Sequence, residues 1–92
     1  MNDTFPKRII VSQDVLFQNL DDEVVLLNLG NERYYGLDPI GTRMWELLTE
    51  RGDPEAIIAQ LLSEFEVGEA TLRADLARLI DELQKAGLVA VE

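Results

Sequence analysis

The sequence contains no histidine and no cysteine, and these two absences exclude many kinds of chemistry. A thiolate nucleophile, a histidine base, a zinc finger, an iron–sulfur cluster and a disulfide each need one of these residues. There is also no run of about 18 apolar residues, and the first ten residues, MNDTFPKRII, contain no hydrophobic signal core. We therefore expect a cytoplasmic protein without a membrane segment, a metal or another cofactor.

Basic residues are scarce as well. The chain has 8 Lys and Arg against 18 Asp and Glu, which gives a net charge of −10. Residues 1–52 hold 5 basic and 9 acidic side chains and residues 53–92 hold 3 and 9, so neither half offers a basic face. Because a phosphate backbone is bound by clustered Lys and Arg, we expect no nucleic-acid partner. The acidity either keeps a small protein soluble or favours neutral and basic partners.

What the chain does contain is enough apolar sequence for one modest core, since 47% of its 92 residues are hydrophobic. Three β-type runs, VLFQNL (residues 15–20), EVVLLNL (23–29) and RYYGL (33–37), are separated by the turn-forming segments DDE and GNE. This pattern predicts a three-stranded antiparallel meander. Both faces of its middle run are largely apolar, which places that strand at the centre. The RIIVS segment near the start predicts a further short strand or an arm, so we divide the chain into an N-terminal arm or strand (1–12) and one domain (13–92).

The second half changes to a helical period. Asp38-Pro39 and Asp53-Pro54 each predict a helix start, Gly52 ends the first helix, and a third helix is expected from about Glu69 to Ala86. The final LVAVE predicts a short strand or tail. The fold class is therefore α+β, with the outline of a winged helix-turn-helix. DNA binding is disfavoured because the third helix mixes basic with acidic residues and because the sheet precedes the helices, whereas a DNA-binding wing usually follows them.

The run EVVLLNLGNERYYGLDPIGTRMWELL, followed by two more helices and LVAVE, resembles the PqqD family, whose members are also called RiPP precursor recognition elements. The resemblance covers about residues 13 to 92 and is most specific in RYYGLDPIGTRMWELL. It is closest to the separate leader-binding protein of lasso-peptide biosynthesis. It implies a non-enzymatic adaptor that binds the leader of a precursor peptide and presents it to a leader-cleaving cysteine protease and an ATP-dependent macrolactam cyclase. The alternative is a carrier for the precursor of pyrroloquinoline quinone beside a radical SAM enzyme.

The resemblance also implies a place for the leader, in a cleft between the third strand (33–37) and the third helix (about 69–83). The residues support this position independently, because the third strand of a meander is an edge with unpaired N–H and C=O groups. Tyr34 and Gly36 share one face of that strand, and Gly36 would let a peptide backbone approach closely. The competing interpretation is that both tyrosines are ordinary strand residues and that Gly36 forms a bulge.

The third helix supplies the second wall, unless it is a plain amphipathic core helix. We expect apolar leader anchors to fill pockets formed by residues of the middle strand and the third helix, with charged residues at the rim. The expected peptide-binding residues are Val25, Leu27, Arg33, Tyr34, Tyr35, Gly36, Leu37, Glu69, Leu72, Arg73, Asp75, Leu76 and Ile80. An enzyme with paired carboxylates is disfavoured because the clustered acidic residues fall in predicted loops. Because an exposed edge strand can pair with a second copy, we expect a monomer or a weak dimer.

Overall fold

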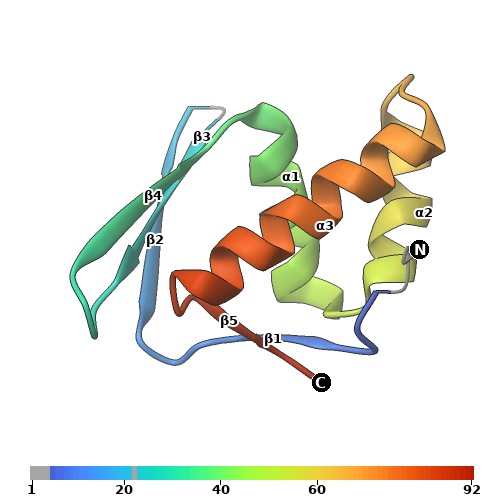
Figure 1. The fold of residues 1–92 in the computed structure, drawn as a ribbon. Coiled ribbons are helices and arrows are strands. Elements are labelled where there is room, and N and C mark those ends of the chain that lie inside the picture. Colours follow the sequence, from blue (N-terminus) through green and yellow to red (C-terminus); the bar gives the residue numbers. More distant parts are fainter. Residues whose placement is uncertain (1–4, 22) are drawn as a thin grey trace.

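Three helices lie beside a small three-stranded sheet in the computed structural model, which describes residues 5–21 and 23–92 (Figure 1). The predicted α+β fold, a three-stranded meander followed by three helices, is confirmed. Among the described residues, no helix is long and apolar enough to cross a bilayer. In chain order the elements are β1 (Ile9–Val11), β2 (Val15–Leu20), β3 (Glu23–Asn28), β4 (Arg33–Leu37), α1 (Pro39–Arg51), α2 (Pro54–Glu64), α3 (Glu69–Lys85) and β5 (Val89–Val91).

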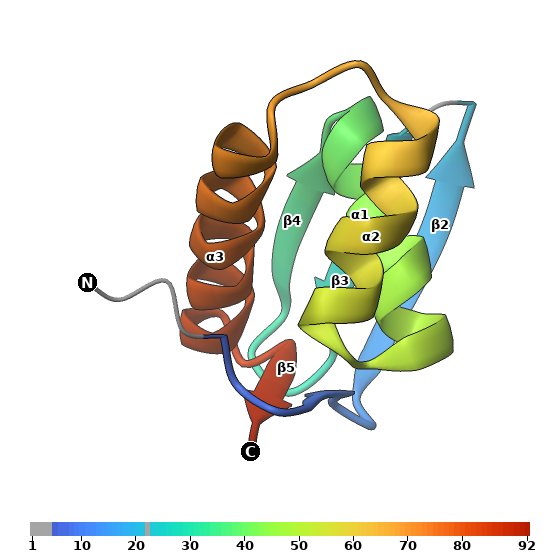
Figure 2. The same ribbon diagram turned by 90° about the vertical axis from the view of Figure 1, so that its right-hand side faces the viewer.

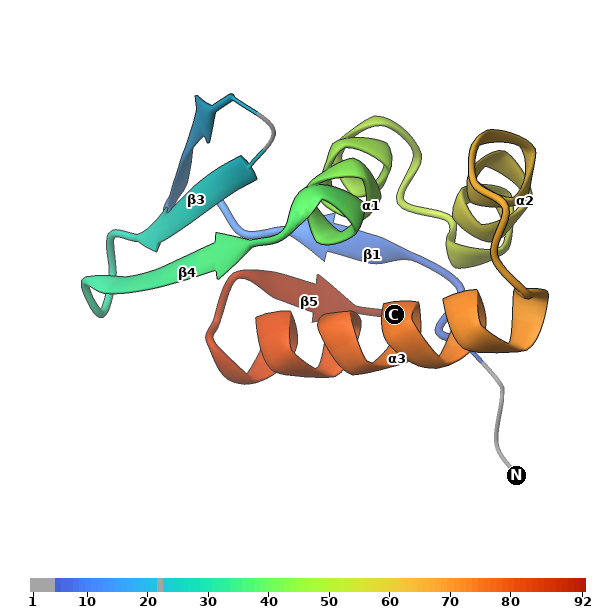
Figure 3. The same ribbon diagram turned by 90° about the horizontal axis from the view of Figure 1, so that it is seen from above.

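The sheet has the strand order β2-β3-β4, and both pairings are antiparallel. β3 is central, so β2 and β4 are the two edges, and β4 runs directly into α1 (Figure 3). The central strand turns Val24 and Leu26 toward the helices, where both are buried, and turns Val25 and Leu27 to the other face. Since both faces of this strand are apolar, the sequence alone does not indicate which of them packs on the helices.

The two ends of the chain meet in a second, two-stranded sheet. β1 pairs with β5 in antiparallel register, with Ile9 opposite Val91 and Val11 opposite Val89. Ile9 is buried, so β1 contributes to the same core as the helices. The RIIVS segment thus contains a strand with a defined partner, while residues 1–4 of the expected arm lie outside the described residues.

The helix boundaries follow from local chemistry. The Asp38 side chain accepts a hydrogen bond from the Gly41 N–H at 2.7 Å and so caps α1, and Asp53 caps α2 by accepting from the Glu55 N–H at 3.0 Å. Gly52 ends α1 with a φ of 70°, a conformation that other residues rarely adopt. The predicted starts at the two Asp-Pro pairs are therefore confirmed.

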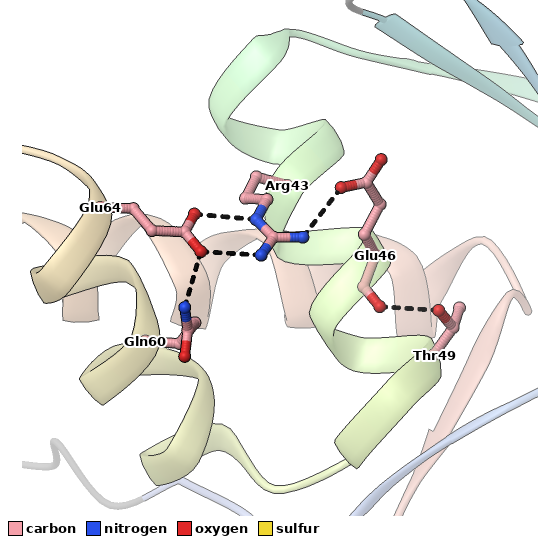
Figure 4. A network of polar contacts seen from close by, with 5 residues as sticks. All are labelled: Arg43, Glu46, Thr49, Gln60 and Glu64. Carbon is pink, nitrogen blue, oxygen red and sulfur yellow. Dashed lines mark hydrogen bonds and ion pairs between the residues drawn. The ribbon is translucent and has the colours of Figure 1, made fainter.

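Charged side chains join α1 to α2 (Figure 4). The guanidinium of Arg43 donates to both oxygens of the Glu64 carboxylate, at 2.8 and 2.7 Å, and also to Glu46 at 3.1 Å. Gln60 adds a third hydrogen bond to Glu64, at 2.8 Å. These hydrogen bonds, those from Arg43 above all, lower the pKa of Glu64 to about 2. The contact links α1, which follows β4 directly, to α2.

Candidate functional site: a cleft between β4 and α3

Among the residues that the structure describes, the backbone of β4 is paired on one side only. The Leu29 N–H donates to the Asp14 carbonyl at 2.8 Å, on the β2 side of β3. Backbone N–H and C=O groups point alternately to the two sides of a strand. Leu26 lies three residues before Leu29, so its N–H and C=O point toward β4, where Leu26 stands opposite Tyr35. The N–H and C=O of Tyr35 therefore belong to the β3–β4 ladder.

The same alternation directs the backbone groups of Tyr34 and Gly36 to the open edge of the sheet. The Tyr34 side chain is 75% exposed. The predicted alternative of a bulge at Gly36 is wrong, because Gly36 stands opposite Val25 in an uninterrupted register. Gly36 has no positive φ, and a Cβ at this position would meet nothing within 4 Å. Neither backbone conformation nor packing within the chain therefore requires a glycine here.

Beside this edge lies a cavity of about 230 Å³ between β4, the first turns of α1 and α3. Figure 2 shows β4 and α3 next to each other. The cavity is smaller than the pockets that enclose whole small-molecule ligands, so it has room for a few side chains of an extended ligand. We call it the β4–α3 cleft. Its lining residues are Tyr35, Gly36, Leu37, Asp38, Ile40, Gly41, Met44, Asp75, Arg78, Leu79 and Glu82.

The floor of the β4–α3 cleft is apolar and its rim is charged. Leu37, Met44 and Leu79 form the floor and are 6%, 2% and 8% exposed. At the rim Arg78 forms an ion pair with Asp75, with 3.2 Å between Nη2 and Oδ1. Together with Asp38 and Glu82, the lining holds three carboxylates against one guanidinium. The cleft therefore combines an apolar floor with a net negative rim.

One end of the cleft is closed by contacts between the β3–β4 hairpin and α3. The Tyr35 hydroxyl donates a hydrogen bond to the Glu82 carboxylate. Burial and this carboxylate together raise the pKa of Tyr35 to about 12, so the hydroxyl remains a donor at neutral pH. Beyond it, the Asn28 side chain donates to the Ala86 carbonyl at 2.8 Å and accepts from the Gly30 N–H at 2.8 Å. The hairpin is thereby attached to the end of α3.

The other end is fixed by Thr42, whose side chain is buried in the first turns of α1. Its Oγ1 accepts from the Val24 N–H at 3.0 Å and donates to the Leu37 carbonyl at 3.4 Å. This hydroxyl connects α1 to the ends of β3 and β4, so it determines how the floor residues of α1 meet the strand.

The structure brings four of the sequence-predicted residues together in the cleft, Tyr35, Gly36, Leu37 and Asp75, and places Tyr34 at the open edge beside it. It does not form the expected pockets between the middle strand and the third helix. Val25 and Leu27 lie on the face of the sheet that points away from the helices. Leu72 and Leu76 are 0% exposed within the core and do not line the cleft.

The remaining predicted residues lie outside the cleft. Ile80 faces the opposite side of α3, near Phe5 and Val91. Arg73 binds Glu69 and Glu55 and so joins α3 to α2. Arg33 is exposed at the start of β4, before the cleft begins. The apolar positions of α3 were predictable from the helical period, but the neighbour of each position depends on how the helix is rotated against the sheet.

Sequence reasoning missed Arg78, Leu79 and Glu82 on α3, and four residues near the start of α1. The three α3 residues could have been predicted from Asp75, because positions 75, 78, 79 and 82 follow the helical spacing and share one face of the helix. Ile40 and Met44 are one turn apart, so they could likewise have been assigned to one face of α1. The sequence contains no corresponding signal that these two faces meet.

The chain is similar to known proteins in sequence and in fold. The family described as "Coenzyme PQQ synthesis protein D (PqqD)" matches residues 23–89. A solved structure described as "TbiB1 in Complex with the TbiA(beta) Leader Peptide" shares 38% sequence identity, covers 87% of this chain and 93% of its own, and superposes with a TM-score of 0.82. Another, "Lasso peptide synthetase B1 complexed with the leader peptide", covers 90% and 98% at 22% identity and a TM-score of 0.81, which shows a shared fold.

A search among curated proteins found no match. The family match spans most of the chain, including the strands and helices that form the β4–α3 cleft. The resemblance drawn from RYYGLDPIGTRMWELL is thus confirmed, and the chain belongs to the PqqD family.

Proposed function

We propose that this protein is a non-catalytic adaptor that binds the leader segment of a ribosomally made precursor peptide. The observation that carries the proposal is an unpaired strand edge beside a cleft with an apolar floor. A peptide that adds a strand to such an edge gains main-chain hydrogen bonds, and alternate side chains can enter the neighbouring cleft. The likeness at 38% identity to a protein solved with a leader peptide supports this choice of ligand.

In this mode the leader pairs with the outward backbone groups of Tyr34 and Gly36. One apolar leader side chain enters the cleft and packs on Leu37 and Leu79. The net negative rim favours neutral or basic leader residues beside that anchor. Because an extended peptide loses conformational entropy on binding, the strand pairing and the anchor together must supply the affinity.

The adaptor would act by tethering. Binding the leader here raises the effective concentration of the attached core peptide at the enzymes that process it, which we propose to be a leader-cleaving cysteine protease and an ATP-dependent cyclase of a lasso-peptide pathway. Tethering requires no reactive group, in agreement with a cleft whose carboxylates Asp75 and Glu82 are engaged by Arg78 and Tyr35. The same binding mode would serve a precursor of pyrroloquinoline quinone, and the neighbouring genes distinguish the two pathways.

The test is a calorimetric titration with a synthetic leader encoded by a short reading frame beside this gene. We expect saturable binding, with amide shift changes concentrated in residues 33–41 and 75–82. Leaders carrying an N-methyl group on single backbone nitrogens should lose affinity at every second position, because only alternate N–H groups of an added strand point to β4. A folded protein that binds no neighbouring leader would contradict the proposed function.

A pair of proline substitutions tests the strand edge on the protein side. Tyr34→Pro removes an N–H that faces the open edge, so we expect it to abolish leader binding while the domain stays folded. Tyr35→Pro removes an N–H of the β3–β4 ladder and should unfold or strongly destabilise the sheet. Leader affinity that survives Tyr34→Pro in a folded protein would show that the leader does not pair with β4.

A further inference from the structure

The small sheet formed by β1 and β5 has an open edge of its own, on the side of β1 that faces α1 (Figure 3). The Ser12 N–H donates to the Leu88 carbonyl at 2.9 Å, on the β5 side. Because backbone groups alternate along a strand, the N–H and C=O of Ile9 and Val11 point away from β5. The Ile9 N–H donates on that side to the Gly52 carbonyl at 2.8 Å. Among the described residues, the N–H and C=O of Val11 have no backbone partner there.

Beside this edge lies a groove of about 420 Å³ between β1 and the last turn of α1. We call it the β1–α1 groove. Its apolar lining comes from Ile10, Val11 and Leu48, and Ile10 is 43% exposed. Of the described residues, none lines both this groove and the β4–α3 cleft. The domain thus has a second strand edge beside a partly apolar groove, at a separate place in the fold.

The rim of the β1–α1 groove is basic, although the chain as a whole is acidic. Arg8 and Arg51 line the groove with a single carboxylate, that of Glu50, and Lys7 precedes Arg8 in the chain. All three basic side chains are exposed. Within residues 5–21 and 23–92, the ion pairs engage four of the eight basic residues, and Lys7, Arg8 and Arg51 are not among them. Counting charges along the sequence did not reveal this cluster, because the fold brings the start of the chain to the end of α1.

These features together indicate the kind of ligand. Three basic residues on a chain with a net charge of −10 are too few to hold a nucleic acid or an anionic membrane. An open strand edge selects a ligand with a peptide backbone, and guanidinium groups at the rim select carboxylates on that peptide. A second copy of this chain is disfavoured as the source, since two chains of the same large net charge repel each other.

We propose that the β1–α1 groove binds an extended acidic segment of a partner protein, which adds to the open edge of β1 as a third strand of the small sheet. The backbone of the segment pairs with the N–H and C=O of Val11. An apolar side chain packs on Ile10 and Leu48, and carboxylates bind Arg8 on the strand and Arg51 on the helix. This site does not depend on the leader, because the leader is proposed to bind the β4–α3 cleft.

The probe is a short peptide with blocked ends in which glutamate alternates with valine, and its counterpart carries lysine in place of glutamate. Each peptide is titrated into the protein by calorimetry, and amide chemical shifts locate the contact. We expect saturable binding of the glutamate peptide, with shift changes in residues 8–12 and 48–52. The lysine peptide should leave these amides unchanged.

Two matched variants test the charges. Arg8→Gln/Arg51→Gln should lower the affinity for the glutamate peptide by about tenfold or more, because it removes both guanidinium groups of the rim. Arg33→Gln/Lys85→Gln removes the same amount of positive charge away from the groove, so this control should bind the peptide as the wild type does. Equal affinities in the wild type and in Arg8→Gln/Arg51→Gln would overturn the proposal.

The strand pairing is tested from both sides. Val11→Pro removes an N–H that points to the open edge, so the folded variant should lose the peptide. N-methylation of single peptide nitrogens gives the same information without altering the protein, and only alternate positions should lose affinity. A glutamate peptide that does not bind, or that shifts amides only outside the groove, overturns the proposal. Affinity that survives N-methylation at every position also overturns it, because the groove would then recognise anions and not a strand.

Discussion

Gly36 is a glycine that its own chain does not need, and this makes it informative. Gly36→Ala should raise the free energy of unfolding by about 0.5–1 kcal/mol, because glycine in a strand loses more conformational entropy than alanine and because a Cβ has open space there. If the missing Cβ serves the guest, leader affinity falls in the same variant. Gly68→Ala is the control for leader affinity, since a Cβ also has space at that position, the N-cap of α3, outside the cleft. Chemical denaturation and calorimetry measure both quantities, and unchanged leader affinity would leave the glycine without a binding role.

Thr42 tests whether a single hydroxyl positions the cleft. Thr42→Val preserves the shape of the side chain but leaves the buried Val24 N–H without its acceptor, so we expect a loss of about 1–3 kcal/mol in unfolding free energy. Thr49→Val is the matched control, because the Thr49 hydroxyl is exposed and binds only a carbonyl of its own helix. Urea denaturation of both variants provides the comparison. Equal losses in the two would mean that the Thr42 contact contributes nothing beyond helix propensity.

The contact between α1 and α2 makes the stability of the fold depend on pH. The pKa of Glu64 is lowered from 4.5 to about 2 in the folded protein, so its stabilising effect is fully present above about pH 4.5 and is lost as the pH falls toward 2. In Glu64→Gln this dependence should be missing. Urea denaturation at several pH values between 5 and 2 should therefore show a steeper decline for wild type than for the variant. Parallel curves would contradict the ion pair with Arg43.

The helices and the meander were predictable because their signals are local. In each Asp-Pro pair the aspartate caps the helix, and the proline occupies a first-turn position at which its missing N–H costs nothing. The turn formers after Leu20 and Leu29 separate the strands. The β1–β5 pairing has no such signal. Its strands have three residues each and lie at opposite ends of the chain, so only the assembled core brings Ile9 and Val91 together.

The cleft was predictable in outline and only partly in its residues. In a meander of three strands, β4 must be an edge. Its pairing with β3 then directs the backbone N–H and C=O of Tyr34 and Gly36 outward. The rotation of α3 decides instead between Leu76, which enters the core, and Leu79, which lines the cleft. Both are leucines of one apolar stripe, so no local pattern separates them.

Viewed as one molecule, the domain gives its small sheet three different surroundings. Within residues 5–21 and 23–92, one face packs on the helices, the β4 edge is open beside a cleft, and the other face is apolar and uncovered. A leader that adds to the edge would extend both faces of the sheet at once. On the helix side it would contact the cleft floor, and on the other side it would lie beside Tyr34. The domain should therefore respond to the leader as a unit and not only at the cleft.

Leader binding should accordingly stabilise the whole fold. A ligand that binds only the folded chain raises the unfolding free energy by about 2.7 kcal/mol at a concentration of 100 times its Kd. For a domain of this size, such a gain corresponds to a rise in Tm on the order of ten degrees. Differential scanning calorimetry with increasing leader measures it, with a scrambled leader of equal composition as control. In hydrogen exchange, the amides of Tyr34 and Gly36 should gain protection together with those of the buried β3 strand, because unfolding from the bound state must first release the leader. Protection confined to β4 would instead describe an edge that binds its guest without coupling to the core.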